Sequence, residues 1–188
     1  EQTIKSIKYL EIEHEILVSQ EGPLGRKKND LIKRAKYENL VILHDYIVFE
    51  HDWAQHALAE KRPWTVMMNQ ILNADGSRYR DWCAWDDPES GDGWPLNTRW
   101  GNYWSPGQPC IVPYSYNRTQ YMYISGAYWV AKKDFMLDNL LHDDLDWGDG
   151  EDVEWSIRAR KTWKYIYNPA IVRLTKQKDV ILPFKDLV

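Results

Sequence analysis

The chain has 188 residues, the usual size of one domain, and its 24 Lys and Arg against 28 Asp and Glu give a formal net charge of −4. This charge argues against a nucleic-acid binder that depends on net positive charge. Hydrophobic residues make up 44% of the chain, enough for one sizeable core, so intrinsic disorder is not expected. No apolar run approaches the roughly 20 residues of a membrane span, and the first residues do not resemble a signal peptide, so we expect a cytoplasmic protein.

Short apolar and β-branched runs predict strands, and helical patterns lie between several of them. In chain order we expect a strand at 15–18, a helix at 26–37, a strand at 40–43, a helix at 52–60, strands at 65–68 and 121–124, helices at 132–141 and 151–163, and a strand at 165–167. This alternation predicts an α/β domain with a mainly parallel sheet covered by helices. We expect one domain over residues 1–188.

The segment from Tyr79 to Trp129 departs from this alternation. It holds 13 of the 23 Trp and Tyr residues and five of the nine prolines, so regular helix is not expected there. Trp and Tyr carry a polar end and suit a binding surface better than Phe does. We therefore expect residues 79–129 to form a packed, aromatic-rich loop region beside the functional site.

The predicted strand at 40–43 ends in His44, Asp45 and Tyr46. Ligands of open α/β sheets bind beyond the carboxyl ends of the strands, and carboxylates and imidazoles bind Mn²⁺-like cations. The structural alternative is an aspartate that caps the next turn. These residues alone leave both interpretations open.

The segment 146–152 is an acidic, glycine-containing turn that runs into the predicted helix at 151–163. Carboxylates at a helix start are expected from the helix dipole alone. Four carboxylates within seven residues also repel one another, which raises a pKa and makes one of them a candidate general base. The helix-dipole explanation and the catalytic one both stay open.

A third candidate is the segment 22–29, GPLGRKKN, a short glycine loop that opens a basic helix. Backbone N–H groups at a helix start, together with Arg and Lys, favour a phosphate. The loop lacks the Gly-Lys-Ser/Thr ending of a Walker motif. A solvated basic face is the alternative.

The order of these segments resembles that of the GT-A glycosyltransferases, and within them the family 2 type. The shared elements are a small-x-x-Arg-Asn-like helix, a strand ending near an Asp-x-Asp motif, a Gly-Gly-like turn at 125–127 and the Glu-Asp helix start GEDVE at 150–154. The resemblance covers about residues 4–172 and implies a GT-A, Rossmann-like fold: a mixed, mainly parallel sheet flanked by helices. Residues 3–7 match the helix after the family's first strand, so we expect either a truncated chain or a minimised fold.

The resemblance implies an enzyme, a hexosyltransferase-type glycosyltransferase. It would move a sugar from a nucleotide diphosphate sugar, by default a UDP-sugar, to a saccharide or other acceptor hydroxyl, with inversion. Asp152 matches the family's catalytic base, and Glu151 flanks it. The residues that the resemblance places at the donor are Lys28, Asn29, Tyr46, Ser125 and Gly126.

The resemblance also implies Mn²⁺ or Mg²⁺ at Asp45 and His44. The family's second aspartate, its main metal ligand, aligns with Tyr46 here. Either Asp45, with or without His44, binds the metal, or the metal is bound weakly or not at all. The family's histidine after the catalytic helix is also missing, which leaves three basic residues to meet the diphosphate: Arg173, Lys176 or Lys178.

Residues 69–82 predict a hairpin with a turn at Asp75 and Gly76. The expected acceptor-binding residues are Arg80, Asp81, Trp82 and Trp147. Arg80 and Asp81 would hydrogen-bond sugar hydroxyls, and Trp82 or Trp85 would stack on a sugar face. An ion pair on the hairpin and a Trp in a minor core are the structural alternative. A carbohydrate-binding protein without catalysis is the alternative function, and a metal nuclease or phosphoesterase is a weaker one.

Overall fold

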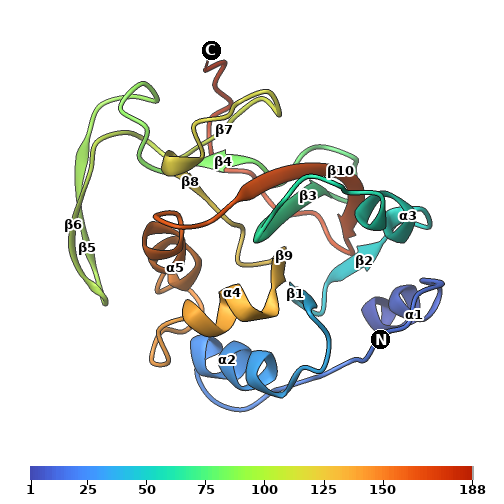
Figure 1. Cartoon of the computed structure of the whole chain (residues 1–188). Coiled ribbons are helices and arrows are strands. Elements are labelled where there is room, and N and C mark those ends of the chain that lie inside the picture. Colours follow the sequence, from blue (N-terminus) through green and yellow to red (C-terminus); the bar gives the residue numbers. More distant parts are fainter. Residues whose placement is uncertain (188) are drawn as a thin grey trace.

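The computed structural model describes residues 1–187, and its centre is a five-stranded mixed sheet (Figure 1). Alternating and continuous apolar runs supply the strands, so most of their side chains are buried. The strands, in their order across the sheet, are β1 (Asn39–Leu43), β9 (Tyr128–Lys132), β3 (Val66–Leu72), β10 (Tyr165–Leu174) and β2 (Ile47–Phe49).

The direction of the strands corrects the fold expected from the sequence. Among residues 1–187, β3 and β10 are the only neighbouring strands of this sheet that run parallel; the pairs β1–β9, β9–β3 and β10–β2 are antiparallel. Strands hold 26% of the residues against 22% for helices, and the sheet curls into a nearly closed, barrel-like form. The prediction of a GT-A, Rossmann-like, mainly parallel sheet flanked by helices is therefore wrong. Apolar runs report burial, not the direction of the neighbouring strand.

The four helices predicted from helical patterns form, each ending earlier than expected, and a helix also forms at residues 3–7, where the resemblance implies one. Helix α2 ends where Ala35 leaves the helical conformation at ψ 140°. Figure 1 shows α2, α4 and α5 on one side of the sheet, with α3 near β10 and α1 near β2. The helices are α1 (Gln2–Lys8), α2 (Leu24–Arg34), α3 (Trp53–Leu58), α4 (Lys133–Asp138) and α5 (Glu151–Ala159).

The aromatic-rich region of residues 79–129 is more ordered than the loop that we expected. It forms a three-stranded sheet and a hairpin, which Figure 1 shows extending away from the central sheet. A short 3-10 helix, Thr119–Tyr121, precedes the last strand. The small sheet has the order β7 (Cys110–Ile111), β4 (Cys83–Ala84) and β8 (Met122–Tyr123), and the hairpin pairs β5 (Trp94–Thr98) with β6 (Gly101–Ser105).

The strand predicted at 15–18 does not form, because this segment has no neighbouring strand. Side chains hold it instead: Glu13 accepts a hydrogen bond from the Tyr37 hydroxyl, and Glu15 accepts one from the backbone N–H of Lys36. No helix among residues 1–187 is long and apolar enough to cross a membrane.

Candidate functional site

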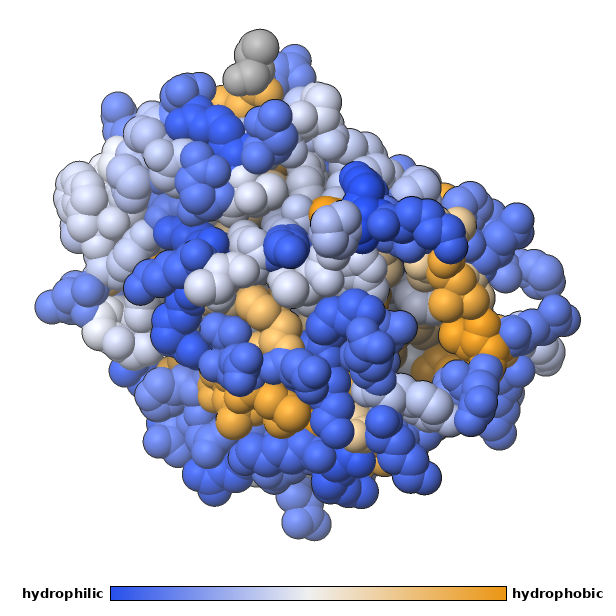
Figure 2. Space-filling model, viewed as in Figure 1, coloured by the Kyte–Doolittle hydropathy of each residue, from blue (hydrophilic) through white to orange (hydrophobic). Residues whose placement is uncertain are grey.

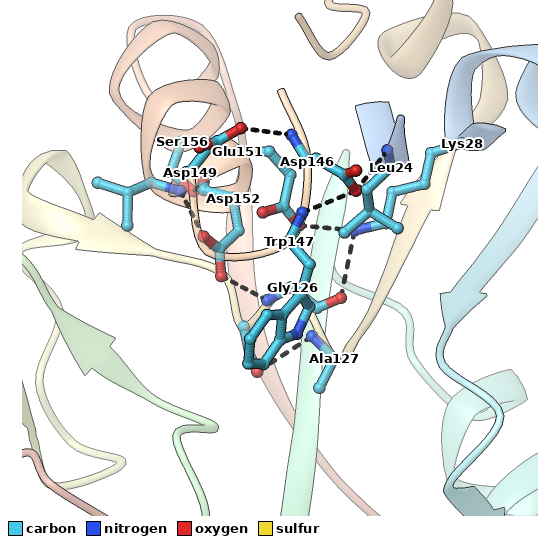
Figure 3. Close-up of polar contacts among 12 residues, drawn as sticks. Leu24, Lys28, Gly126, Ala127, Asp146, Trp147, Asp149, Glu151, Asp152 and Ser156 are labelled. Atoms are coloured by element: carbon cyan, nitrogen blue, oxygen red, sulfur yellow. Dashed lines mark hydrogen bonds and ion pairs between the residues drawn. The ribbon is translucent and has the colours of Figure 1, made fainter. Parts of the chain in front are cut away.

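The start of α5 and the turn Ser125–Ala127 meet in the centre of the molecule. Gly150 precedes α5 in the left-handed conformation, at φ 73°, which a glycine adopts without strain. The Oδ2 atom of Asp152 accepts a hydrogen bond of 2.8 Å from the backbone N–H of Gly126 (Figure 3). A Cβ atom at Gly126 would lie 2.9 Å from this oxygen and 2.9 Å from Glu151 Oε1. A side chain at position 126 would therefore displace both carboxylates.

The environment of Asp152 raises the pKa of its carboxyl group. Burial, followed by the negative charge of Glu151, raises the pKa of Asp152 to about 6, although Lys28 and two backbone N–H groups act in the opposite direction. Half of its capacity to accept hydrogen bonds is used on Gly126 and on its own helix, through the N–H of Val153 at 2.9 Å. A carboxylate with a pKa near neutrality is suited to general-base catalysis.

Glu151 is neutralised by a buried lysine from α2. Lys28 Nζ lies 3.0 Å from Glu151 Oε1 and donates to the carbonyl oxygen of Gly126 at 3.3 Å, as Figure 3 shows. The side chains of Lys28 and Glu151 are 6% and 7% exposed, and the ammonium group also lies 4.7 Å from the ring of Trp129. Lys28 therefore holds the Glu151–Gly126 unit together, and its ammonium group is engaged inside the protein.

The two other carboxylates of the acidic turn shape the turn itself. Asp146 Oδ1 accepts hydrogen bonds from the N–H groups of Leu24 and Trp147, and Asp149 Oδ2 accepts one from the N–H of Asp146. Asp149 also pairs with Arg99 of the β5–β6 hairpin at 2.8 Å. The structural explanation of the acidic cluster thus holds for Asp146 and Asp149. Glu151 is held in its ion pair with Lys28, which leaves Asp152 as the candidate for chemistry.

The end of β1 lies next to this centre. The backbone N–H of His44 donates to the carbonyl oxygen of Ala127 at 3.0 Å, so the strand end is fixed to the Ser125–Ala127 turn. The His44 Nε2 atom is buried and has no hydrogen-bond partner among residues 1–187. Burial and the nearby charges of Lys28 and Lys178 lower the pKa of His44 to about 4, so the ring is neutral at pH 7.

Three basic side chains gather at the two tyrosines Tyr46 and Tyr79. The ammonium groups of Lys176 and Lys178 lie 4.8 and 3.8 Å from the centre of the Tyr46 ring, and Lys178 lies 5.7 Å from the Tyr79 ring. The guanidinium of Arg80 is 5.8 Å from the same Tyr79 ring. We call Arg80, Lys176 and Lys178 the cationic cluster.

The cationic cluster and Asp152 act on the same pair of tyrosines. Burial is the main cause of the raised pKa of Tyr46 and of Tyr79, and the charge of Asp152 adds to it in both cases. The backbone reinforces this arrangement, because the N–H of Thr175 donates to the carbonyl oxygen of Tyr46 at 2.9 Å. The segment after β10 is thereby held against the end of β1.

The residues at the end of β1 do not fit a divalent cation. Asp45 is the single carboxylate of the His44–Tyr46 segment, its side chain is exposed, and lysine ammonium groups lie over the neighbouring Tyr46 ring. Mg²⁺ and Mn²⁺ prefer several oxygen ligands, and among residues 1–187 no group of three or more His, Cys, Asp and Glu side chains is placed to bind a metal. The Mn²⁺ or Mg²⁺ expected at Asp45 and His44 stays a prediction without support from the geometry.

Two hollows border the site. An apolar cavity of about 1000 Å³ lies between the N-terminal residues, α2 and β1, and its lining includes Lys28, His44 and Asp45. Figure 2 shows hydrophobic side chains at the surface in the part of the molecule where α1 lies. A second hollow of about 410 Å³ is formed by the β5–β6 hairpin and the acidic turn, and its lining includes Trp85, Trp100 and Gly150.

Several predicted site residues lie elsewhere than expected. Asn29 is 1% exposed, and its amide is bonded to Leu141 and Asp143, so it joins α2 to the segment after α4 and does not face a donor. Asp81 is fully buried and accepts hydrogen bonds from Arg78 and Tyr114, and Trp82 is 3% exposed. The prediction that Asp81 and Trp82 contact an acceptor is therefore corrected: they belong to the core.

The other predicted residues divide into three groups. Asp152, Glu151, Ser125 and Gly126 meet at the start of α5, and His44 and Tyr46 lie beside them. Trp147 is 77% exposed, in the acidic turn that borders the second hollow. Of the three basic candidates for the diphosphate, Arg173 is paired with Glu50, whereas Lys176 and Lys178 lie in the cationic cluster. No sequence pattern indicated a role for Tyr79, because its position depends on the hairpin after β3.

No protein-family model matches the chain, and no curated protein matches its sequence.

Proposed function

We propose that the chain is a glycosyltransferase that moves a hexosyl group from a nucleotide diphosphate sugar, by default a UDP-sugar, to an acceptor hydroxyl. The observation that carries this proposal is one partly buried carboxylate, Asp152, which is hydrogen-bonded to Gly126 and whose charge acts on Tyr46 and Tyr79, the two tyrosines that three cations approach. A base and a cationic cluster at one centre match the two needs of sugar transfer, a proton acceptor for the hydroxyl and positive charge for the diphosphate. The ordered motifs in the sequence point the same way, and the proposal does not depend on a GT-A fold.

Asp152 is the general base in this proposal. Its carboxylate takes the proton of the acceptor hydroxyl while the hydroxyl oxygen attacks the anomeric carbon of the donor. The bond from that carbon to the diphosphate oxygen breaks, and the nucleotide diphosphate leaves with the electron pair, which inverts the anomeric centre. The pKa of about 6 leaves Asp152 deprotonated at pH 7 and still basic enough to share a proton in the transition state. No step is assigned to Mn²⁺ or Mg²⁺.

Glu151 and Lys28 are positioning residues. Their buried ion pair fixes the carbonyl group of Gly126, and the N–H of the same glycine fixes Asp152. The backbone of residue 126 thus couples the ion pair to the base. Such pre-organisation matters because a small misplacement of a catalytic group costs about 10²-fold in rate.

The acceptor is assigned to the hollow beside the β5–β6 hairpin. Trp100 donates from its ring N–H to the carbonyl oxygen of Asp149 at 3.1 Å, so an aromatic wall stands next to the start of α5. Aromatic faces with polar neighbours suit a saccharide. The exposed ring of Trp147 lies in the same acidic turn.

The test is a screen of donors by the release of nucleotide diphosphate. The purified chain is incubated with UDP-, GDP-, ADP- and dTDP-hexoses, with and without a panel of saccharide acceptors. We expect release from one donor that increases when an acceptor is added. Binding to immobilised glycans without release from any donor would instead identify a non-catalytic carbohydrate-binding protein and overturn the proposal.

A further inference from the structure

We propose that the cationic cluster of Arg80, Lys176 and Lys178 binds the donor's diphosphate and neutralises the leaving group in place of a divalent cation. This inference rests on the proposed function and goes beyond it, because it assigns a binding site and predicts that the reaction needs no metal. It differs from the expectation of Mn²⁺ or Mg²⁺ that the sequence motifs raise.

Three positive charges come together in the cationic cluster from two segments that are far apart in the sequence. Arg80 follows the hairpin after β3, and Lys176 and Lys178 follow β10, about 100 residues later. Burial lowers the pKa of Lys178, and the charges of Lys176 and Arg80 lower it further, so the three groups repel one another. Folding holds them together through backbone contacts, since the Lys178 N–H donates to Asn73 Oδ1 at 3.0 Å.

The cationic cluster also lacks the direct carboxylate partners that most arginines of residues 1–187 have. Within residues 1–187, none of the three makes an ion pair, whereas eight other arginines of the chain are paired with Asp or Glu: Arg26, Arg62, Arg78, Arg99, Arg118, Arg158, Arg160 and Arg173. The Nε atom of Arg80 is buried without a hydrogen-bond partner. A buried guanidinium N–H without an acceptor is costly, so an oxygen-rich anion fits this position.

The backbone of Arg80, one member of the cationic cluster, is strained. Arg80 is the one residue other than glycine with a positive φ among residues 1–187, at 38°. A non-glycine residue is rarely held in this conformation unless its surroundings require it, and such strain concentrates at ligand sites. The Arg80 guanidinium lies 5.8 Å from the centre of the Tyr79 ring, which the Lys178 ammonium group approaches to 5.7 Å.

The position of the cluster fits the reaction. Lys176 and Lys178 lie over the ring of Tyr46, and the charge of Asp152, the base of the proposed function, acts on the same tyrosine. Lysine ammonium groups at this position supply the positive charge that a carboxylate-bound metal ion would otherwise supply. When the carbon–oxygen bond to the diphosphate breaks, the electron pair moves to a phosphate oxygen, and the cluster stabilises that charge.

The experiment measures the binding of UDP and of inorganic pyrophosphate to the full chain by calorimetry in EDTA, and again with 1 mM Mn²⁺ in place of EDTA. Pyrophosphate makes the result independent of the nucleotide base. We expect both probes to bind in EDTA, with no divalent cation present. The double variant Lys176→Gln/Lys178→Gln, and separately Arg80→Gln, should weaken binding by about tenfold or more.

The matched control is Lys161→Gln/Lys164→Gln, which removes the same charge from two exposed lysines after α5 and should bind as the wild type does. Thermal melting checks that each variant folds. The single variant Lys176→Gln keeps the test valid if a buried substitution prevents folding, because Lys176 is exposed. Lys178→Arg, which retains the charge, should keep most of the affinity.

Two results would overturn the inference: binding that is lost in EDTA and restored by Mn²⁺, or unchanged affinity in the cluster variants. The failure of the proposed function looks different. Sugar transfer that requires Mn²⁺ and proceeds at the wild-type rate in the cluster variants would refute the inference. The proposed glycosyltransferase function would still hold. Metal-independent binding of both probes that the cluster variants weaken, without transfer from any donor, would support the cluster as a diphosphate site and refute the glycosyltransferase.

Discussion

The carboxylate of Asp152 accepts a hydrogen bond from the backbone N–H of Gly126 at 2.8 Å, and the carbonyl group of the same glycine accepts one from Lys28. One residue without a side chain therefore connects the candidate base to the buried ion pair that neutralises Glu151. The expected effects of changing this centre follow from that connection.

The rate of transfer should depend on the ionisation of Asp152. Because burial and Glu151 raise its pKa to about 6, kcat/KM should rise between pH 5 and pH 7 with a midpoint near pH 6. A profile of kcat/KM against pH, measured with the donor that the release screen identifies, tests this. A profile that is flat over that range would contradict the role of Asp152 as the base.

The raised pKa of Asp152 also makes the stability of the fold depend on pH, in the direction opposite to the rate. The folded chain binds this proton more tightly than the unfolded chain, whose pKa is near 3.8, so the contribution of Asp152 to stability is present at low pH and is lost as pH rises from about 4 through 6. Replacement by Asn removes this loss. In urea unfolding, Asp152→Asn should lose less stability than the wild type between pH 4 and pH 7.

Gly126→Ala should damage the site by steric displacement. The new Cβ atom would lie 2.9 Å from Asp152 Oδ2 and from Glu151 Oε1, so both carboxylates must move. We expect a stability loss of about 1–3 kcal/mol and a rate loss of about 10²-fold. Gly76→Ala is the control, because its φ of 86° strains an alanine while no atom lies within 4 Å of the new Cβ. Full activity of Gly126→Ala would show that the glycine is not needed at the site.

The buried pair Lys28–Glu151 should matter for stability far more than an exposed pair on the same helix. Lys28→Met leaves Glu151 charged and buried, which costs about 3–5 kcal/mol in urea unfolding. Arg26→Ala is the matched control: the Arg26–Asp144 pair is 54% and 66% exposed, and its loss should cost less than about 1 kcal/mol. Equal effects of the two variants would refute the account of Glu151.

Trp147→Ala should affect the acceptor and spare the donor. The ring is 77% exposed, so its removal should not change the melting temperature. We expect KM for the acceptor to rise about tenfold, the effect of ~1.4 kcal/mol, with KM for the donor unchanged. Trp104→Ala, which removes a ring that is 63% exposed on the hairpin, is the control. A rise in the donor KM instead would place Trp147 on the other side of the site.

The sequence predicted where elements lie better than how they pair. Apolar runs located β1, β3 and β10 and all four later helices, because burial needs a contiguous apolar surface whatever the neighbour is. They did not show that β9 inserts between β1 and β3 in the antiparallel direction. That order depends on contacts between residues about 65 to 90 apart along the chain, which no local pattern records.

The candidate site was predicted in part for a similar reason. The GEDVE motif and the Ser125–Ala127 turn do meet, since Gly126 allows close approach and Gly150 adopts the left-handed conformation before α5. Asn29 and Asp81 were assigned to ligands although they bond to Leu141 and to Arg78 inside the protein. A polar residue in a sequence gives no sign of whether its partner is a ligand or another part of the chain.

The most direct test of the account is the release of nucleotide diphosphate from the leading donor by Asp152→Asn at pH 7. We expect this variant to release nucleotide diphosphate about 10²–10⁴-fold more slowly than the wild type while it stays folded, because a general base contributes about that much. Asp138→Asn, which changes an exposed aspartate at the end of α4, should act as the wild type does. A folded Asp152→Asn variant that releases nucleotide diphosphate at the wild-type rate would contradict the account.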